Sequence, residues 1–179
     1  MCIRDRDGTV NWICEGLKGY IESRPATDRE RVYIGTWGAM FYAIDRKTGK
    51  KVWEFDTRRG RYFSPGACWP VVLPYTANGG KQQEQVIVLS SDYFVRAFQP
   101  STGEILWASD EAKGRESLGF SPDGKTMYIK GIKNNITAAD ISKGVYTPLW
   151  NTAMPYENNF IPTRMETTEQ YVFIPTEFG

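Results

Sequence analysis

The sequence predicts an all-β fold in which one structural unit recurs along the 179 residues. The first observation is a motif of the form A-x-D-x-x-T-G-x-x-x-W, whose fixed points are Ala43, Asp45, Thr48, Gly49 and Trp53. The second observation is that this motif returns along the chain. The third is that no segment is a convincing helix, whereas strand patterns separated by turn residues are frequent.

Further copies of the motif share its glycine and its tryptophan. The second copy has Ala97, Thr102, Gly103 and Trp107, with Gln99 at the position of the aspartate. A looser copy has Ala138, Asp140, Gly144 and Trp150, with two extra residues before the tryptophan. The end of another copy is carried by Asp7, Gly8 and Trp12. Successive motif tryptophans are 41, 54 and 43 residues apart, and recurrence at such distances is typical of solenoids, propellers and arrays.

The motif is expected to form the tight turn of a hairpin and the start of the next strand. Before it, Val32–Ala43 is apolar and β-prone, and after it Lys50–Phe55 alternates between polar and apolar residues. Gly49 supplies the positive φ that such a turn needs. The Asp and Thr of the motif can hydrogen-bond their own turn backbone. Trp53 is the large apolar side chain that fills the space beside the turn.

We expect three complete four-stranded units and two partial ones. Their bounds are 1–16 (partial), 19–57, 66–111 and 115–153 (complete) and 160–179 (partial). The first complete unit has predicted strands Gly19–Thr27, Arg31–Thr36, Met40–Asp45 and Lys51–Asp56. The second has Ala67–Pro74, Glu84–Ser90, Val95–Gln99 and Ile105–Ser109. The third has Glu116–Phe120, Thr126–Lys130, Ile136–Asp140 and Thr147–Thr152, and the last begins with Phe160–Met165 and Tyr171–Thr176. Insertions on either side of Pro70 are expected to lie in loops.

Runs such as Val86–Leu89 are apolar on both faces of the predicted strand. That pattern fits sheets packed on both sides, as the blades of a β-propeller are, whereas a sandwich would give cleaner alternation. The chain begins within a unit. At the other end, Val172–Gly179 aligns with Val32–Gly38 and stops just before the motif should recur. We therefore expect a β-propeller fragment that belongs to a longer protein.

The composition excludes several classes of site and partner. Lys and Arg number 22 against 21 Asp and Glu, so no global charge favours nucleic acid or a membrane surface. Histidine, the commonest general base and transition-metal ligand, does not occur. The three cysteines, Cys2, Cys14 and Cys68, have no metal-binding spacing, and an odd number argues against a disulfide framework. No apolar run of about 18 residues predicts a transmembrane segment.

The motif at 43–53, its copy at 97–107 and the weaker copy at 138–150 resemble the quinoprotein-type, PQQ-like β-propeller repeat of the BamB-like and quinoprotein alcohol dehydrogenase-like superfamily. The resemblance implies seven or eight blades, tied together by tryptophans that dock against the neighbouring blade. It is specific for the fold and not for an activity, because such propellers serve dehydrogenases, the periplasmic lipoprotein of the outer-membrane β-barrel assembly machinery and many exported proteins. The segment Arg115–Gly124 resembles these exported proteins, some of which carry a calcineurin-like metallophosphoesterase domain.

Dehydrogenases of this family hold pyrroloquinoline quinone (PQQ) on the propeller axis, with calcium bound by acidic and amide ligands and usually a stacking pair of adjacent cysteines. The sequence has no adjacent cysteines and no acidic cluster outside turns, so we expect no cofactor, metal ligand or catalytic residue. The predicted function is a non-enzymatic scaffold or binding module of an exported bacterial protein in the periplasm or cell envelope. Its expected partner is a protein or a polar ligand. Part of a PQQ-dependent dehydrogenase, or an accessory propeller of a metallophosphoesterase, are the alternatives.

Two groups of residues form the candidate binding surface. Charged residues recur near the first strands, which line the channel: Glu22, Arg24, Arg115, Glu116, Glu157 and Arg164. A basic and aromatic insertion contains Arg58, Arg59, Arg61 and Tyr62, and Trp69 follows it. Arginine and aromatic residues are enriched at interface hot spots. The simpler interpretations are a solvated rim of paired charges and an ordinary inter-blade loop. The motif tryptophans are expected in core packing rather than in a cofactor stack, and Cys68 as a small buried residue.

Overall fold

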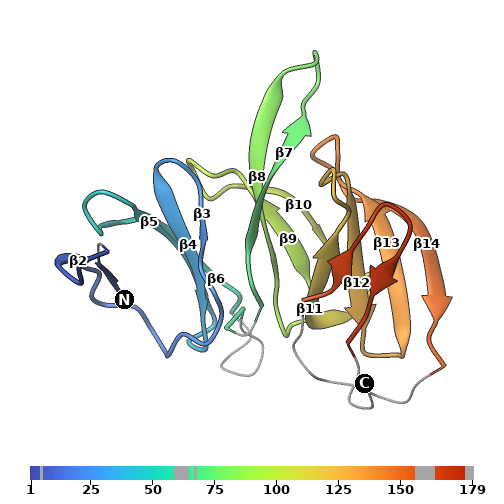
Figure 1. Ribbon diagram of the computed structural model, residues 1–179, viewed down its shortest axis with the longest axis horizontal. Coiled ribbons are helices and arrows are strands. Elements are labelled where there is room, and N and C mark those ends of the chain that lie inside the picture. The colour runs from blue at the N-terminus through green and yellow to red at the C-terminus, as the bar shows by residue number, and fades with distance from the viewer. Residues whose placement is uncertain (5, 59–64, 67, 156–163, 176–179) are drawn as a thin grey trace.

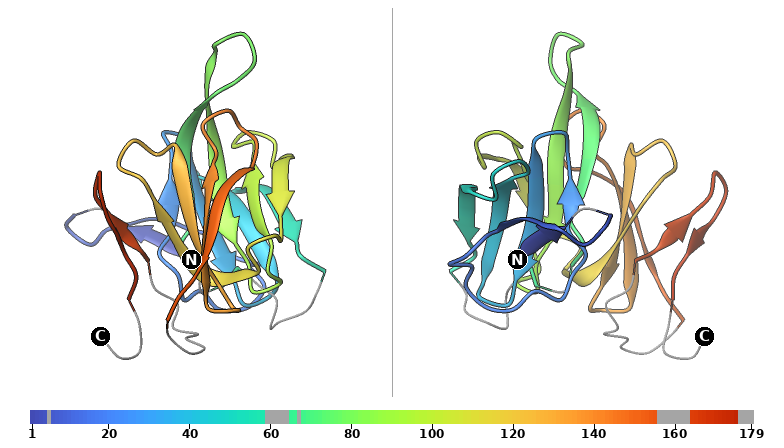
Figure 2. Two further views of the ribbon diagram at one scale, coloured as in Figure 1. Left: turned by 90° about the vertical axis from the view of Figure 1, so that its right-hand side faces the viewer. Right: turned by 60° about the vertical axis from the view of Figure 1, so that its left-hand side comes forward.

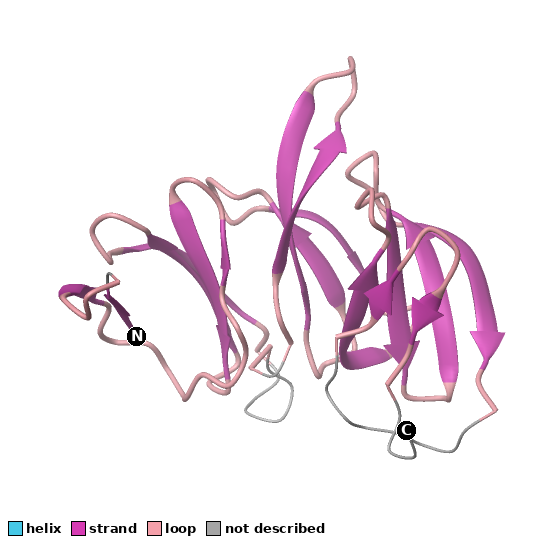
Figure 3. Ribbon diagram, viewed as in Figure 1, coloured by secondary structure: helices cyan, strands magenta, loops and turns pink. Residues whose placement is uncertain are grey.

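The computed structural model describes residues 1–4, 6–58, 65–66, 68–155 and 164–175, and within these ranges the chain forms strands and turns but no helix (Figure 3). The all-β prediction is confirmed. Correspondingly, nothing in these ranges is a helix that could cross a membrane.

Three four-stranded antiparallel sheets follow one another along the chain, each with its strands in sequence order. The first sheet contains β3 (Ala26–Thr27), β4 (Arg31–Thr36), β5 (Met40–Asp45) and β6 (Lys51–Asp56). The second contains β7 (Val71–Thr76), β8 (Gln82–Leu89), β9 (Val95–Phe98) and β10 (Ile105–Ser109). The third contains β11 (Gly114–Phe120), β12 (Thr126–Gly131), β13 (Asn135–Asp140) and β14 (Thr147–Ala153). Two-stranded sheets flank them: β1 (Cys2–Arg4) with β2 (Val10–Ile13), and β15 (Glu166–Thr167) with β16 (Val172–Phe173).

The sheets stand side by side in an arc, with the two chain ends at its opposite ends (Figures 1 and 2). Neighbouring sheets meet through their first or second strands, since β3 contacts β7, β8 contacts β11, and β11 contacts β15. Because successive strands are antiparallel, the connections between sheets and the turns between second and third strands share one face, which we call the connection face. The turns between third and fourth strands lie on the opposite face, which we call the turn face.

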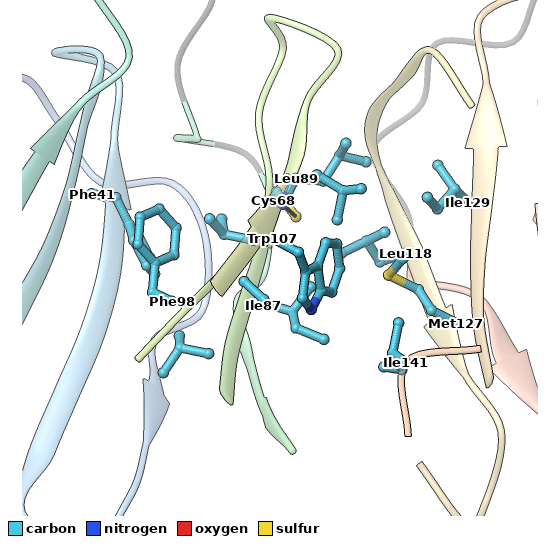
Figure 4. Close-up of a cluster of buried hydrophobic side chains, with 14 of the residues drawn as sticks. Phe41, Cys68, Ile87, Leu89, Phe98, Trp107, Leu118, Met127, Ile129 and Ile141 are labelled. Carbon is cyan, nitrogen blue, oxygen red and sulfur yellow. Dashed lines mark hydrogen bonds between the residues drawn. The ribbon is translucent and has the colours of Figure 1, made fainter. Parts of the chain in front are cut away.

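Strands are apolar on both faces because each sheet is packed between two neighbours. Val86, Ile87, Val88 and Leu89 in β8 are all at most 1% exposed. One cluster of side chains continues from Phe41 and Phe98, between the first two sheets, to a group between the second and third (Figure 4). The second group contains Ile87, Leu89, Trp107, Leu118, Met127, Ile129 and Ile141. This double-sided burial is the reason for the continuous apolar runs in the sequence.

The tryptophan of one sheet lies on the motif glycine of the next sheet. The Trp12 indole donates from Nε1 to the carbonyl oxygen of Arg46 at 2.8 Å, and a Cβ at Gly49 would meet its ring at 2.7 Å. Trp53 likewise donates to the carbonyl oxygen of Pro100 at 2.8 Å and lies against Gly103.

The positive φ predicted for Gly49 is confirmed at +73°, and Gly103, at the same place in the second copy of the motif, has a φ of +75°. The turn itself is held by Asp45, whose Oδ1 accepts hydrogen bonds from the backbone N–H of Lys47 and from both the N–H and the hydroxyl of Thr48. The aspartate and threonine of the motif thus shape the turn, and the glycine leaves room for the indole.

The third such interface, between the second and third sheets, places an aromatic ring on the motif glycine with different residues. The ring on Gly144 belongs to Tyr75 in β7 and not to Trp107. Trp107 donates from Nε1 to the side-chain oxygen of Gln85, and the Gln85 amide donates to the carbonyl oxygen of Ile141, both at 3.0 Å. Ile141 stands three residues before its glycine, as Arg46 and Pro100 do before theirs. The prediction that Trp107 docks directly on the next sheet is therefore wrong: Trp107 is connected to the carbonyl of Ile141 through the side chain of Gln85. This difference accompanies the longer turn before Trp150.

Strand bounds differ from the prediction where chain segments bridge sheets. The predicted strand Gly19–Thr27 is reduced to β3, because residues before Pro25 bond to other loops: Ser23 N–H donates to the carbonyl oxygen of Gly66. The insertion after Pro70 does not form a loop. It lengthens β7 and β8 into a hairpin that projects from the turn face (Figure 1).

Two further expectations concern the last units. Trp150 is 46% exposed, whereas Trp12 and Trp107 are 8% exposed, so core packing is wrong for Trp150. No residue of the next sheet covers it in the described part of the chain, because the sheet beyond β14 is represented there by β15 and β16 alone.

The predicted strand Phe160–Met165 falls mostly outside the described residues, and the nearest described strand is β15.

Trp53→Ala should lower the free energy of unfolding by about 3 kcal/mol, near the lower end of the usual cost of truncating a core aromatic. The side chain is half-buried and packs on Phe98, with ring centroids 5.6 Å apart. Trp53→Phe keeps most of the packing and should lose only about 1 kcal/mol for the hydrogen bond to Pro100. Urea denaturation followed by circular dichroism measures both changes. Trp69→Ala, at a tryptophan that is 43% exposed, is the control. If Trp53→Ala matched that control, the indole contact would not hold the sheets together.

Candidate functional site

The predicted charged residues lie in or next to the segments that lead into the first strands. Glu22 and Arg24 are exposed in the loop before β3, Arg115 is in β11, and Arg164 precedes β15. Glu116 is in β11, but its side chain lies outside the described part. Arg59, Arg61, Tyr62 and Glu157 also fall outside the described residues.

Glu22 belongs to a cluster that we call the aromatic cluster, formed by Tyr20, Glu22 and Trp37. The Trp37 indole donates from Nε1 to Glu22 Oε2 at 2.6 Å, and its ring centroid is 6.0 Å from that of Tyr20. Tyr20 is exposed and Trp37 is half-buried. A carboxylate held by an indole beside an exposed phenol offers apolar surface and a fixed acceptor at one place, which is the composition of binding hot spots.

The backbone beneath the aromatic cluster is tightly packed. Trp37 N–H donates to the carbonyl oxygen of Tyr20 at 3.0 Å. Gly19 has a φ of +78°, and a side chain there would collide with the backbone of Gly38. The Trp37 ring also lies on Gly66, in the connection before β7. The cluster is therefore positioned by the first sheet and by the connection that leads to the second.

A buried ion pair supports the connection face at the second sheet. Asp92 and Arg96 are 1% and 7% exposed and form two parallel hydrogen bonds, of 3.0 and 2.5 Å, across the β8–β9 turn. The guanidinium carbon lies 4.7 Å from the Phe94 ring centroid and 5.4 Å from that of Phe55 in the first sheet. A desolvated bidentate pair is costly to break, because the remaining charge would be buried alone. The pair thus fixes this turn against β6.

The basic and aromatic insertion is described only at its two ends. Arg58 is exposed with a φ of +57°, and its N–H donates to Asp56 Oδ1 at 2.7 Å. Trp69 is exposed beside buried Cys68, whose sulfur accepts the Leu89 N–H at 3.3 Å. The small buried role predicted for Cys68 is confirmed by its 1% exposure. That the insertion contributes to a binding surface stays a prediction.

Two ion pairs on this face join residues that are close in sequence. Arg164 Nε lies 3.7 Å from Glu166 Oε1, and Lys113 pairs with Asp110. Among the residues that the structure describes, no group of three or more Cys, Asp or Glu side chains is arranged to hold a metal ion. Asp45, Asp123 and Asp140 instead accept hydrogen bonds within their own turns.

Sequence reasoning missed Trp37, Tyr20, Asp92 and Arg96. A signal for the ion pair was present, since Arg96 interrupts an apolar strand and stands four residues after an aspartate. The aromatic cluster had no comparable signal, because Glu22 and Trp37 are separated by a complete hairpin.

The Asp28 carboxylate lies in the turn between β3 and β4 and accepts several hydrogen bonds. Its oxygens accept the Tyr33 hydroxyl at 2.6 Å and the backbone N–H groups of Glu30 and Arg31 at 2.7 and 2.5 Å. Burial raises the pKa of Asp28, but these hydrogen bonds lower it by more, so its pKa lies below the usual 3.8. Burial, together with the bond to Asp28, raises the pKa of Tyr33 far above its ordinary value.

The arc of four-stranded sheets tied by aromatic contacts defines the class as a β-propeller of PQQ-like repeats. Residues 1–159 match the family described as outer membrane protein assembly factor BamB, and the chain belongs to this family. It is also similar to quinohemoprotein alcohol dehydrogenase of Comamonas testosteroni, with 28% identity over an alignment of 116 residues that covers 56% of this chain and 16% of that enzyme.

Solved structures show the same fold. The crystal structure of that enzyme matches with a TM-score of 0.64 and 20% identity, over 89% of this chain and 33% of the enzyme chain. BamB from Moraxella catarrhalis gives 0.55 and 20%, over 75% of this chain and 37% of its own. The computationally designed Ika4 protein gives 0.70 and 16%, over 96% and 94%. The chain therefore spans about a third of the natural propellers that it resembles.

Lowering the pH should destabilise the first sheet once the pH falls to the usual aspartate value of 3.8 and below. The folded pKa of Asp28 is below the unfolded value, so its contribution is complete above the unfolded pKa and is lost as the pH falls through the folded pKa. Asp28→Asn should flatten this dependence, and Glu169→Gln, at an exposed carboxylate, should not. Urea denaturation at pH values on both sides of 3.8 checks it. Parallel curves for wild type and Asp28→Asn would contradict the prediction.

Proposed function

We propose that this chain is part of a non-enzymatic β-propeller that binds a polypeptide or another polar ligand on its connection face. The observation that carries the proposal is the aromatic cluster, in which Tyr20 is exposed and the Glu22 carboxylate is held in place by Trp37. Membership in a family described as an assembly factor supports a protein partner. By the same membership, we propose that the protein acts in the bacterial cell envelope.

The match to the Comamonas alcohol dehydrogenase favours a second candidate, which is part of a quinoprotein dehydrogenase. Such an enzyme would need convergent oxygen ligands for calcium. The described carboxylates do not fit that need: Asp45 and Asp140 are bound within turns, Asp92 is paired with Arg96, and Glu22 accepts the Trp37 indole. We therefore derive no step through a quinone and keep the binding module as the proposal.

Titration of the purified chain with PQQ and calcium separates the two candidates. We expect no stoichiometric binding of either, because the carboxylates named above already have hydrogen-bond or ion-pair partners. Isothermal calorimetry and the absorbance of the quinone are the two measurements. Binding of one equivalent with a micromolar dissociation constant would reverse the ranking and favour the dehydrogenase.

Selection of phage-displayed peptides on the immobilised chain tests the binding face directly. Enriched peptides should lose affinity by about tenfold or more when a central aromatic contact is removed, as at interface hot spots. We expect this loss for Trp37→Ala. The matched control is Gln82→Ala, at an exposed residue of the β7–β8 hairpin on the turn face. Peptides that bind both variants equally well would place the binding surface elsewhere.

A further inference from the structure

The projecting part of the β7–β8 hairpin has one edge without a neighbouring strand. β8 pairs with β7 as far as Gln82, which lies opposite Thr76. Its pairing with β9 ends earlier, at Val86 opposite Phe98, because the chain then turns toward β10. The hairpin extends beyond the turns of the other sheets on this face (Figure 1). Residues 82–85 of β8 therefore form an edge on the side where β9 would continue.

The backbone groups at this edge belong to Gln82 and Glu84. In an antiparallel pair, opposite residues alternate between pairs that exchange backbone hydrogen bonds and pairs that do not. Ala77 N–H donates to the carbonyl oxygen of Lys81 at 2.9 Å. By alternation from that pair, Gln82 and Glu84 direct their N–H and C=O groups away from β7. Among the residues that the structure describes, none forms a hydrogen bond with these four groups.

The outer edge of β7 is closed to an added strand. Pro74 has no backbone N–H, and the Thr76 N–H donates to the carbonyl oxygen of Ser142 at 2.7 Å. Proline and a covering segment are two of the ways in which natural sheets protect an edge. The β8 edge contains no proline between Gln82 and Gln85. The hairpin can therefore accept a strand on its β8 side and not on its β7 side.

The hairpin is held against the third sheet through its other side. Tyr75 is 7% exposed, covers Gly144 and donates its hydroxyl to Gln83 Oε1 at 2.6 Å. The Gln85 amide donates to the carbonyl oxygen of Ile141. These contacts are made by β7 and by side chains of β8, so a strand added to the backbone edge leaves them in place. Because the edge is already ordered, less conformational freedom is lost on binding.

We propose that the β8 edge at Gln82 and Glu84 binds an extended polypeptide segment of a partner protein as an additional strand, with a lysine or arginine of that segment opposite Glu84. Two N–H and two C=O groups in a row match the donors and acceptors of an extended backbone, as in other cases of strand addition. This surface is separate from the connection face, and the inference does not depend on the aromatic cluster.

Glu84 determines the charge of the partner segment. Its side chain is exposed, and it forms no ion pair or hydrogen bond with another residue in the described part of the chain. It is also the only charged residue within 82–85. Opposite charges directly across a strand pair stabilise it, and like charges destabilise it. A basic residue at the facing position is therefore favoured over an acidic one.

Selection of phage-displayed linear peptides tests the proposal with the Trp37→Ala chain as bait, so that peptides that need the aromatic cluster are not enriched. Enriched peptides should share a lysine or arginine within a segment free of proline. Binding of the synthetic peptides is measured by isothermal calorimetry. Glu84→Pro in the same chain should weaken binding by about tenfold or more, because it removes an edge N–H and places a ring in the path of the strand.

The Glu84→Pro variant should keep its fold, because the lost N–H does not bond to β7 and proline is tolerated at a strand edge. Circular dichroism and thermal melting check this. Glu84→Gln keeps the edge N–H and should weaken binding only about threefold, the range of an exposed ion pair, with a smaller dependence on salt. Gln82→Ala keeps both backbone groups and should bind as the unaltered edge does.

Hydrogen exchange of single amides gives a second measurement on the same complexes. The N–H groups of Gln82 and Glu84 should exchange more slowly when peptide is bound. The Gln83 N–H faces Tyr75 in the β7–β8 ladder and should not change. A selection without enriched peptides would overturn the proposal. So would binding that Glu84→Pro leaves intact, or enriched peptides that carry no basic residue.

Discussion

The contact between an indole and a glycine on the turn face is the constraint on which the arc depends. Gly49 meets two demands at once: its φ of +73° is left-handed, and its missing side chain leaves the space that Trp12 fills. Either demand alone would favour glycine. Together they exclude every other residue, because a Cβ would both strain the turn and displace the ring. The carbonyl of Arg46 then receives the indole N–H, so the buried donor is satisfied.

The interface between the second and third sheets shows which features of the indole–glycine contact are kept when the residues change. Gly144 is covered by a phenol, and the carbonyl of Ile141 receives its hydrogen bond from Gln85. What is kept is an aromatic ring on the glycine and a donor for the carbonyl three residues earlier. Tyr75 and Gln85 both belong to the long β7–β8 hairpin, and Thr76 N–H adds a bond of 2.7 Å to the carbonyl oxygen of Ser142. The insertion after Pro70 therefore strengthens an interface whose turn has been lengthened.

The fold could be predicted further than the site because its signals are local and repeated. Strands β4, β5, β6 and β10 have the predicted bounds, since alternation and turn residues determine them within a few positions. The segment before β3 could not be predicted in the same way, because Ser23 bonds to Gly66 and Tyr20 to the Trp37 turn instead of to a neighbouring strand. Tyr75 was missed for a related reason: its partner Gly144 is in another sheet, and no pattern links them.

The aromatic cluster and the docking contacts lie on opposite faces, and this separation has a functional consequence. On the turn face the motif side chains are already engaged, either within the turn as Asp45 is or against the next sheet as Trp53 is. A ligand bound there would compete with the contacts that join the sheets. On the connection face the sheets are joined from beneath, by packing such as Trp37 on Gly66 and by the Asp92–Arg96 pair. Exposed side chains such as Tyr20 can change on this face without loosening the arc, which supports the connection face as the binding face proposed above.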